Sequence, residues 1–175
     1  MKKETGMKIL VTFYSQTGNT RKVAETIYKE LEGENDLRPL EEVTSLEGYD
    51  LVFIGFPVIQ FGPPRIVRRF LTDRAGGKKI AMFVTHASWD SEELRPALDA
   101  WLGKCRSAAS GSDLVGFFDC RGELSESSAK LFLMSEIPEV RYFGSLQPQT
   151  KGHPDEMDLG RARDFTKIII TKFQR

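Results

Sequence analysis

The sequence has few cysteines, no long apolar run and no excess of charge of either sign. Cys105 and Cys120 match no CxxC or zinc-type spacing, and a chain of 175 residues does not need a disulfide framework. We therefore expect two reduced thiols in a cytoplasmic protein. Twenty-five basic and 25 acidic residues cancel, which gives no global field for nucleic acid or an anionic membrane. No apolar stretch approaches the roughly 18 residues of a membrane span.

The length predicts one domain with a full hydrophobic core. We place this domain at residues 7–175. Residues 1–6 lack the apolar core of a signal peptide and are expected to form a disordered lead-in.

Four apolar, β-prone runs alternate with amphipathic helical patterns. The runs are 8–14, 50–57, 79–85 and 113–119, and each is typical of a strand buried on both faces. Segment 36–43 contains Pro39, which an edge strand tolerates.

Helical spacing of apolar residues follows most of these runs. We expect helices after residue 20, between Pro64 and Gly76, around 94–105, at 126–136 and at 155–173. Residues expected on buried helix faces include Ile66, Trp101, Leu131 and Phe132. Residues 137–154, rich in proline and glycine, are expected to be irregular.

This order of elements predicts an α/β fold, a doubly wound and mostly parallel sheet with helices on both faces. Such sheets bind ligands beyond the carboxyl ends of their strands. The loops to inspect are therefore 15–20, 56–62, 86–90 and 120–124.

The first of these loops, SQTGNT, has the composition of an anion site. Its hydroxyl and amide side chains can donate hydrogen bonds, Gly18 lets the backbone turn, and the following helix offers unpaired N–H groups. Neither GxGxxG nor a GKS/GKT sequence is present, which favours a monophosphate. The alternative is a polar loop that only caps the helix.

The segment FYSQTGNTRKVAETI resembles the FMN phosphate-binding signature of the flavodoxin family, and the order of elements resembles that family over nearly the whole chain. The resemblance implies a five-stranded sheet of order 2-1-3-4-5 and FMN as the cofactor. It also implies that the phosphate is held by Ser15, Gln16, Thr17, Gly18, Asn19 and Thr20.

By the same resemblance, the loop GFPVIQFG would pack on the flavin ring. The residues implied are Pro57, Val58, Ile59, Phe61 and Gly62, with Ile59 or Phe61 flanking the ring and Gly62 near its N5. The alternative is that Phe56 and Phe61 pack beneath the next helix.

The loop THASWD would meet the pyrimidine edge of the flavin through Thr85, His86 and Ala87. Trp89 or His86 would cover the second face of the ring, although Trp89 could instead anchor the core. His86 has no carboxylate partner nearby in the sequence, and we assign no catalytic residue. Cys120 is placed at the flavin edge, with a role in packing as the alternative.

Residues 124–152 form an extended last connection that resembles the longer one of some flavodoxin-like subfamilies, and we expect a lid or a partner surface there. The segment GHPDEMD at 152–158 suits a helix start. A metal site would need a second group of ligands, so no metal is expected.

Six basic residues lie between residues 65 and 79, against the single acid Asp73. Arg65, Arg68 and Arg69 should project outward beside the flavin rim. They could meet an acidic redox partner or the phosphate of a nicotinamide nucleotide, or be simply solvated.

We interpret the chain as an FMN-binding electron-transfer protein that carries one or two electrons between redox partners, rather than as a stand-alone enzyme. One alternative is a flavin-dependent NAD(P)H:quinone-type reductase. The other is a flavodoxin-fold interaction module without FMN.

Overall fold

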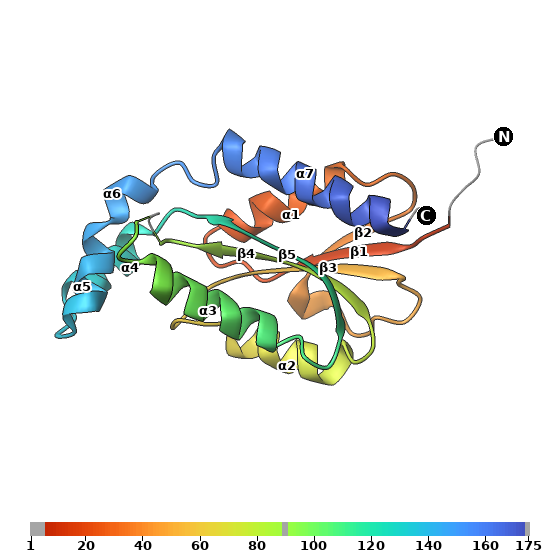
Figure 1. The fold of residues 1–175 in the computed structure, drawn as a ribbon, viewed down its shortest axis with the longest axis horizontal. Helices are drawn as coiled ribbons and strands as arrows, with labels where there is room; N and C mark the ends of the chain where they lie inside the picture. The colour runs from red at the N-terminus through yellow and green to blue at the C-terminus, as the bar shows by residue number, and fades with distance from the viewer. Residues whose placement is uncertain (1–5, 89–90, 174–175) are drawn as a thin grey trace.

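The fold was analysed in a computed structural model, which describes residues 6–88 and 91–173 (Figure 1). The expected lead-in, apart from Gly6, and Trp89 lie outside the described residues. Within them, the strands are β1 (Ile9–Phe13), β2 (Asp36–Pro39), β3 (Leu51–Pro57), β4 (Lys79–His86) and β5 (Asp113–Arg121). They form a parallel sheet of order β2-β1-β3-β4-β5, which confirms the predicted flavodoxin-like topology.

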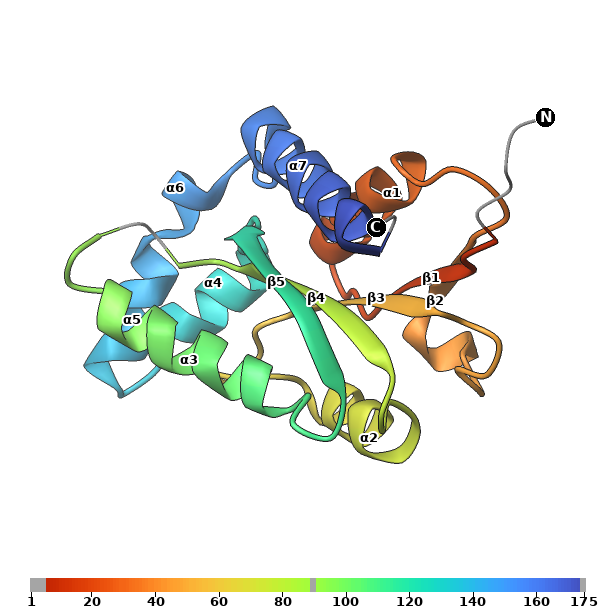
Figure 2. The ribbon, with the colours of Figure 1, turned by 45° about the vertical axis from the view of Figure 1, so that its right-hand side comes forward.

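Helices cover both faces of the sheet. The helices α1 (Asn19–Lys29) and α7 (Glu156–Phe173) lie on one face, and α2 (Arg65–Arg74) and α3 (Arg95–Ser107) lie on the other (Figures 1 and 2). Three short helices, α4 (Glu126–Leu133), α5 (Pro138–Ser145) and α6 (Gln147–Thr150), gather beyond the carboxyl ends of the strands. A short 3-10 turn, Leu40–Glu42, follows β2. None of the described helices combines the length and hydropathy needed to cross a bilayer.

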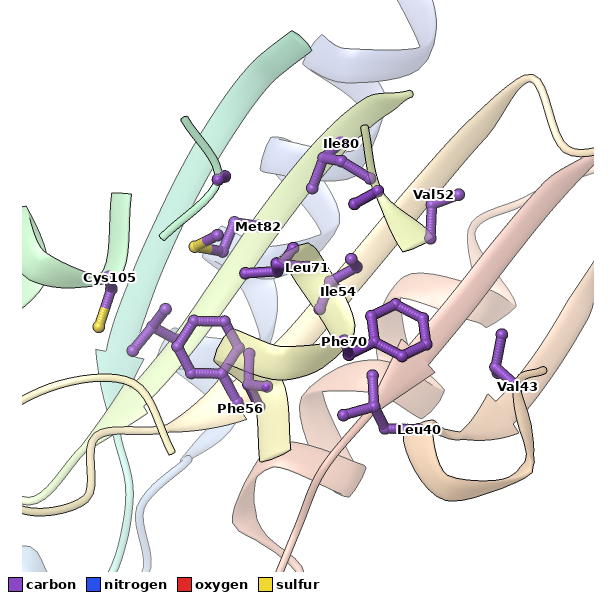
Figure 3. Packing of buried hydrophobic residues seen from close by; sticks show 14 of the residues in the cluster. Leu40, Val43, Val52, Ile54, Phe56, Phe70, Leu71, Ile80, Met82 and Cys105 are labelled. Carbon is purple, nitrogen blue, oxygen red and sulfur yellow. The ribbon is translucent and has the colours of Figure 1, made fainter. Parts of the chain in front are cut away.

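The core consists of two apolar layers, one on each side of the sheet. Alternate residues of β3 divide between them: Ile54 and Phe56 face α2 and α3 (Figure 3), whereas Phe53 faces α1 and α7. All three side chains are fully buried. Burial of one such side chain contributes about 1.5–3 kcal/mol, so these central strands hold the loops at their carboxyl ends in place.

Gly55 in β3 marks a close approach within the second layer. A Cβ built on this residue would lie 1.9 Å from Cε2 of Phe83, a fully buried ring on β4. The ring therefore occupies the volume that a side chain at residue 55 would need. The absence of a side chain there is a packing requirement of the fold.

Some expectations about buried faces and irregular segments were wrong. Ile66 is 38% exposed and Leu131 is 69% exposed, because α2 buries Val67, Phe70 and Leu71, and α4 buries only Ala129. The strand β5 is an edge strand and is mostly half-buried rather than buried.

Residues 137–154, expected to be irregular, contain α5 and α6. Pro138 occupies the first turn of α5, where its missing N–H costs nothing. A Cβ at Gly144 would lie 2.9 Å from the carbonyl O of Ala129. The proline and the glycine therefore start a helix and permit close helix packing instead of breaking the chain.

Candidate functional site

A cavity of about 450 Å³ opens at the carboxyl ends of the strands. All four predicted loops contribute to it, the fourth through Gly122, Glu123 and Leu124. The predicted site residues that line it are Ser15, Gln16, Thr17, Asn19, Thr20, Pro57, Val58, Ile59, Phe61, Thr85, His86 and Ala87. The sheet therefore brings together loops that are more than about 100 positions apart in the sequence, as expected for a ligand site on a parallel sheet.

The loop between β1 and α1 presents N–H groups to one end of this cavity. Ser15 Oγ accepts hydrogen bonds from the N–H groups of Gly18 (3.2 Å) and Arg21 (3.4 Å), and Gly18 has a positive φ of 95°. In contrast, the N–H groups of Thr17 and Asn19 find no acceptor within residues 6–88 and 91–173. Free donors at a helix start are what an anion needs.

Two hydrogen bonds fix this loop against the rest of the cavity. The hydroxyls of Thr20 and Thr85, both buried, lie 2.7 Å apart and tie α1 to the end of β4. The side-chain amide of Asn19 donates to the carbonyl O of Glu123 (2.8 Å), which ties α1 to the segment after β5. The anion loop is thus held on both sides.

The loop after β3 makes a tight turn at the mouth of the cavity. Ile59 and Gly62 exchange backbone hydrogen bonds of 2.9 and 3.3 Å, and Gln60 and Phe61 between them have φ of 50° and 64°. Left-handed conformations at non-glycine residues cost energy and are found preferentially at functional sites. The turn leaves Phe61 45% exposed at the cavity, while Gly62 is buried and does not line it.

Phe56 and Phe61, for which packing beneath the next helix was the alternative role, lie in different surroundings. Phe56 is fully buried between the sheet and the helices α2 and α3, and it belongs to the core. Phe61 instead packs against Trp101 of α3, with ring centroids 5.2 Å apart. Only the second of these rings is available to a bound molecule.

A side wall of the cavity comes from residues that the sequence did not indicate. Trp101, expected in the core, lies between Phe61 and Phe143 of α5, with centroids 5.2 Å from each. Phe132 and Val140 add apolar surface from α4 and α5. The extended connection after residue 124 therefore forms part of the site. The one available signal was its two phenylalanines within a polar, proline-containing segment.

His86 has a carboxylate partner that the sequence did not reveal. Its Nε2 lies 3.2 Å from Oδ2 of Asp119 on β5, and the histidine side chain is 5% exposed. Burial by itself would raise the pKa of Asp119, but the hydrogen bond from His86, with Arg161 and Arg106 nearby, lowers this pKa below its ordinary value. Asp119 is therefore ionised at neutral pH.

Cys120 does not line the cavity. It is 2% exposed and packs in the core layer beneath α1 and α7, on the face of β5 opposite to Asp119. Burial raises the pKa of its thiol, and raises that of Cys105 to about 12. Both thiols are therefore protonated and unreactive, which agrees with the packing role and not with a place at the flavin edge.

The start of α7 brings His153, Asp155 and Asp158 together, with ligand atoms within 4.8 Å of one another. These groups already bond to each other. Asp155 and Asp158 each accept the backbone N–H of the other, and His153 Nδ1 lies 2.6 Å from Asp158 Oδ2. The hydrogen bond from the Asp158 N–H is the main cause of a lowered pKa at Asp155. This is the arrangement of a helix cap.

The basic residues of α2 lie on the surface, as expected. Arg65, Arg68 and Arg69 are exposed, and Arg69 forms an ion pair of 3.4 Å with Asp73 one turn later. Exposed pairs of this kind contribute little to stability.

Comparisons with known proteins agree with this geometry. The flavodoxin domain family matches residues 10–167. The chain is 30% identical over 176 residues to the flavodoxin-like domain-containing protein BilS of Clostridioides difficile, covering 95% of this chain and 98% of that protein.

Solved structures share the fold. Flavodoxin 2 of Bacillus cereus, in its oxidised form, superimposes with a TM-score of 0.57 at 21% identity, covering 94% of this chain and 99% of that one. A flavoprotein of Lactobacillus acidophilus, solved in complex with FMN, gives a TM-score of 0.51 at 19% identity, covering 71% and 97%. The sheet order, the position of the cavity and the match over residues 10–167 lead to one conclusion: the chain belongs to the flavodoxin domain family.

Proposed function

We propose that this protein binds FMN and transfers electrons between redox partners. The observation that carries the proposal is the cavity itself, in which unpaired N–H groups at the start of α1 lie at one end of an apolar space bordered by aromatic rings. A molecule with a monophosphate at one end and a planar ring at the other matches this distribution. The flavoprotein of Lactobacillus acidophilus, which shares the fold, was solved with FMN.

The residues present fit such a cofactor. Ser15, Thr17 and Asn19 would hold the phosphate, and no lysine is needed because N–H groups and the helix dipole supply the positive potential. Phe61 and the loop that contains Ala87 would border the ring. When bound, FMN would supply the one- and two-electron chemistry, and the protein would supply its binding and orientation.

The chain's own residues would also shield the site. Trp101, Phe132 and Phe143 form an apolar side wall that excludes water. Phe61 at the mouth keeps contact with solvent, where a partner could approach. Both cysteines are free and buried, which supports the cytoplasmic location that we expect.

Titration with FMN and with riboflavin tests the proposal, because riboflavin lacks only the phosphate. We expect FMN to bind with a shifted visible absorption band and riboflavin to bind at least about 100-fold more weakly, since two or more charge-assisted hydrogen bonds are lost. Thr17→Ala should weaken FMN binding, whereas Thr171→Ala on the exposed side of α7 should not. Failure of the wild-type protein to bind FMN would favour an interaction module instead.

The apolar wall from α4 and α5 also favours a second candidate, a reductase that uses NAD(P)H and a small acceptor such as a quinone. A pure carrier needs only the ring loops, whereas Phe132, Val140 and Phe143 extend the cavity beyond them. Oxidation of NADPH by the FMN-loaded protein, with a quinone and no partner protein, would support the reductase. The absence of turnover would leave the carrier.

We further propose that an acidic redox partner docks on Arg65, Arg68 and Arg69. The probe is a reduced acidic ferredoxin, and the readout is its rate of electron transfer to the FMN-loaded protein at several salt concentrations. Replacement of the three arginines by glutamate should slow the transfer at low salt and reverse the sign of its salt dependence. Lys167→Glu on α7 serves as the control. Unchanged rates in the triple variant would contradict docking at this patch.

A further inference from the structure

The floor of the cavity contains a buried polar atom without a protein partner. His86 lines the cavity, and its Nδ1 has no hydrogen bond to any described residue, although the side chain is only 5% exposed. Buried polar side-chain atoms nearly always have a partner in native proteins. An unpartnered atom beside a cavity therefore points to a group on the molecule that the cavity binds.

The bond between Nε2 and Asp119 determines whether Nδ1 is a hydrogen-bond donor or an acceptor. Asp119 is ionised and can only accept hydrogen bonds, so Nε2 of His86 must carry the proton shared with it. A neutral imidazole has one donor and one acceptor, and the bond at one nitrogen fixes the state of the other. Nδ1 is then a bare acceptor.

The alternation of side chains along the strands supports this geometry. Residues Ile80, Met82 and Val84 of β4 face α2 and α3, so His86 lies on the same side of the sheet. Phe117 of β5 also faces that side, which places Asp119 beside His86 across neighbouring parallel strands. Both residues are therefore fixed by the sheet and not by a loose loop.

We propose that His86, oriented by Asp119, accepts a hydrogen bond through Nδ1 from an N–H or O–H group of the bound cofactor. The inference rests on the proposed binding of FMN, which carries an imide N–H and several ribityl hydroxyls. Loss of this acceptor should therefore weaken cofactor binding.

Other charged groups surround the pair and have to be separated from it. Arg106 of α3 and Arg161 of α7 act on Asp119, and Arg121 lies opposite His86 in the strand register. Glu123 lines the cavity, but its carboxylate accepts the N–H of Gly152 at 3.0 Å. Variants at His86 leave these groups in place, so their effect on binding reports on the imidazole.

Two substitutions of His86 separate its nitrogens. The amide of glutamine reaches as far as Nε2 and can keep the bond to Asp119, whereas that of asparagine reaches only as far as Nδ1. We expect His86→Gln to weaken FMN binding about ten-fold and His86→Asn to stay within about three-fold of wild type. Equal affinities for wild type and His86→Gln would overturn the proposal.

Nuclear magnetic resonance of the wild-type protein tests the same point without any variant. The chain has two histidines, and the structure predicts opposite tautomers for them. His86 should carry its proton on Nε2, and His153, whose Nδ1 meets Asp158, should carry its proton on Nδ1. Oxidised FMN should shift the Nδ1 resonance of His86 and leave His153 unchanged.

Asp119→Asn supplies the last arm of the test. An amide at this position can donate to Nε2, which moves the proton to Nδ1 and replaces the acceptor by a donor. The nitrogen spectrum should show this exchange, and FMN affinity should fall as in His86→Gln. If wild type binds FMN but the Nδ1 resonance does not move, this inference fails and the proposed function stands. If wild type does not bind FMN, both fail.

Discussion

Gly55→Ala should destabilise the protein because of a single ring. A methyl group at this position would lie 1.9 Å from Cε2, 2.1 Å from Cζ and 2.6 Å from Cδ2 of Phe83. Normal carbon–carbon contact begins near 3.5 Å, so the ring would have to withdraw by about 1.6 Å. Phe83 is fully buried between the sheet and the helices α1 and α7, so no open space receives it.

The magnitude follows from two opposing effects. Overpacking a well-filled core costs up to about 3 kcal/mol, while replacement of a strand glycine by alanine otherwise gains about 0.5–1 kcal/mol. We therefore expect Gly55→Ala to lower the free energy of unfolding by about 2 kcal/mol. Urea unfolding followed by circular dichroism measures this difference.

A double-mutant cycle identifies the cause. Phe83→Ala alone should cost about 3–5 kcal/mol. In that background the clash is gone, so Gly55→Ala should stabilise by about 0.5–1 kcal/mol, and the sign of its effect reverses. The control is Gly103→Ala in α3, where an added Cβ would meet no atom within 4 Å apart from its own helix backbone and chain neighbours, and a gain of about 0.5–1 kcal/mol is expected. Equal destabilisation by Gly55→Ala in both backgrounds would refute the role of the ring.

Three further predictions concern the two thiols, the Tyr49–Asp36 bond and the bond from Asn19 to Glu123. Cys105 and Cys120 should resist a thiol reagent at pH 8 in the folded protein and react at once in denaturant; rapid labelling of the native state would contradict their burial. Tyr49 OH donates a hydrogen bond of 2.5 Å to Asp36, which lowers the pKa of Asp36 below 3.8. Burial, and to a lesser extent this bond, raises the pKa of Tyr49 above 10.0. The extra stability of wild type over Tyr49→Phe should therefore be constant between about pH 5 and 9. It should be lost below about pH 4, as the carboxylate protonates, and above about pH 10, as the phenol ionises. If the urea midpoints of the two proteins differ by the same amount at every pH, the bond does not act in this way. Asn19→Ala removes the bond to the segment after β5 and should weaken FMN binding about ten-fold in an absorption titration, an expectation that equal affinities would disprove.

The fold could be predicted because its signals are local. Each central strand is a continuous apolar run, and the loop at 15–20 carries its signature within six residues. The helix α5 was missed because Pro138 and Gly144 were interpreted as breakers. One starts the helix and the other lies where α4 crosses it closely, and such a contact cannot be seen from the segment itself.

Residues of the site could be predicted only where a single continuous segment carries the sequence signal. His86 and Asp119 are 33 positions apart and meet through the pairing of β4 with β5. Trp101 has the spacing of a core residue on α3, but it lies near the cavity because α5 packs against it. Both depend on tertiary neighbours, so a sequence pattern could not assign them.

The bond between Asn19 and Glu123 joins groups 104 positions apart. A nascent chain that ends before β5 already contains the loop at 15–20, but it lacks the residues after β5 that line the other side of the cavity. If the chain binds FMN as proposed, its capture should therefore wait until synthesis has passed residue 123 and the last strand has paired. A molecule that binds only the completed fold stabilises it by mass action and adds nothing to earlier stages. Cofactor supply would then protect finished protein without speeding its folding.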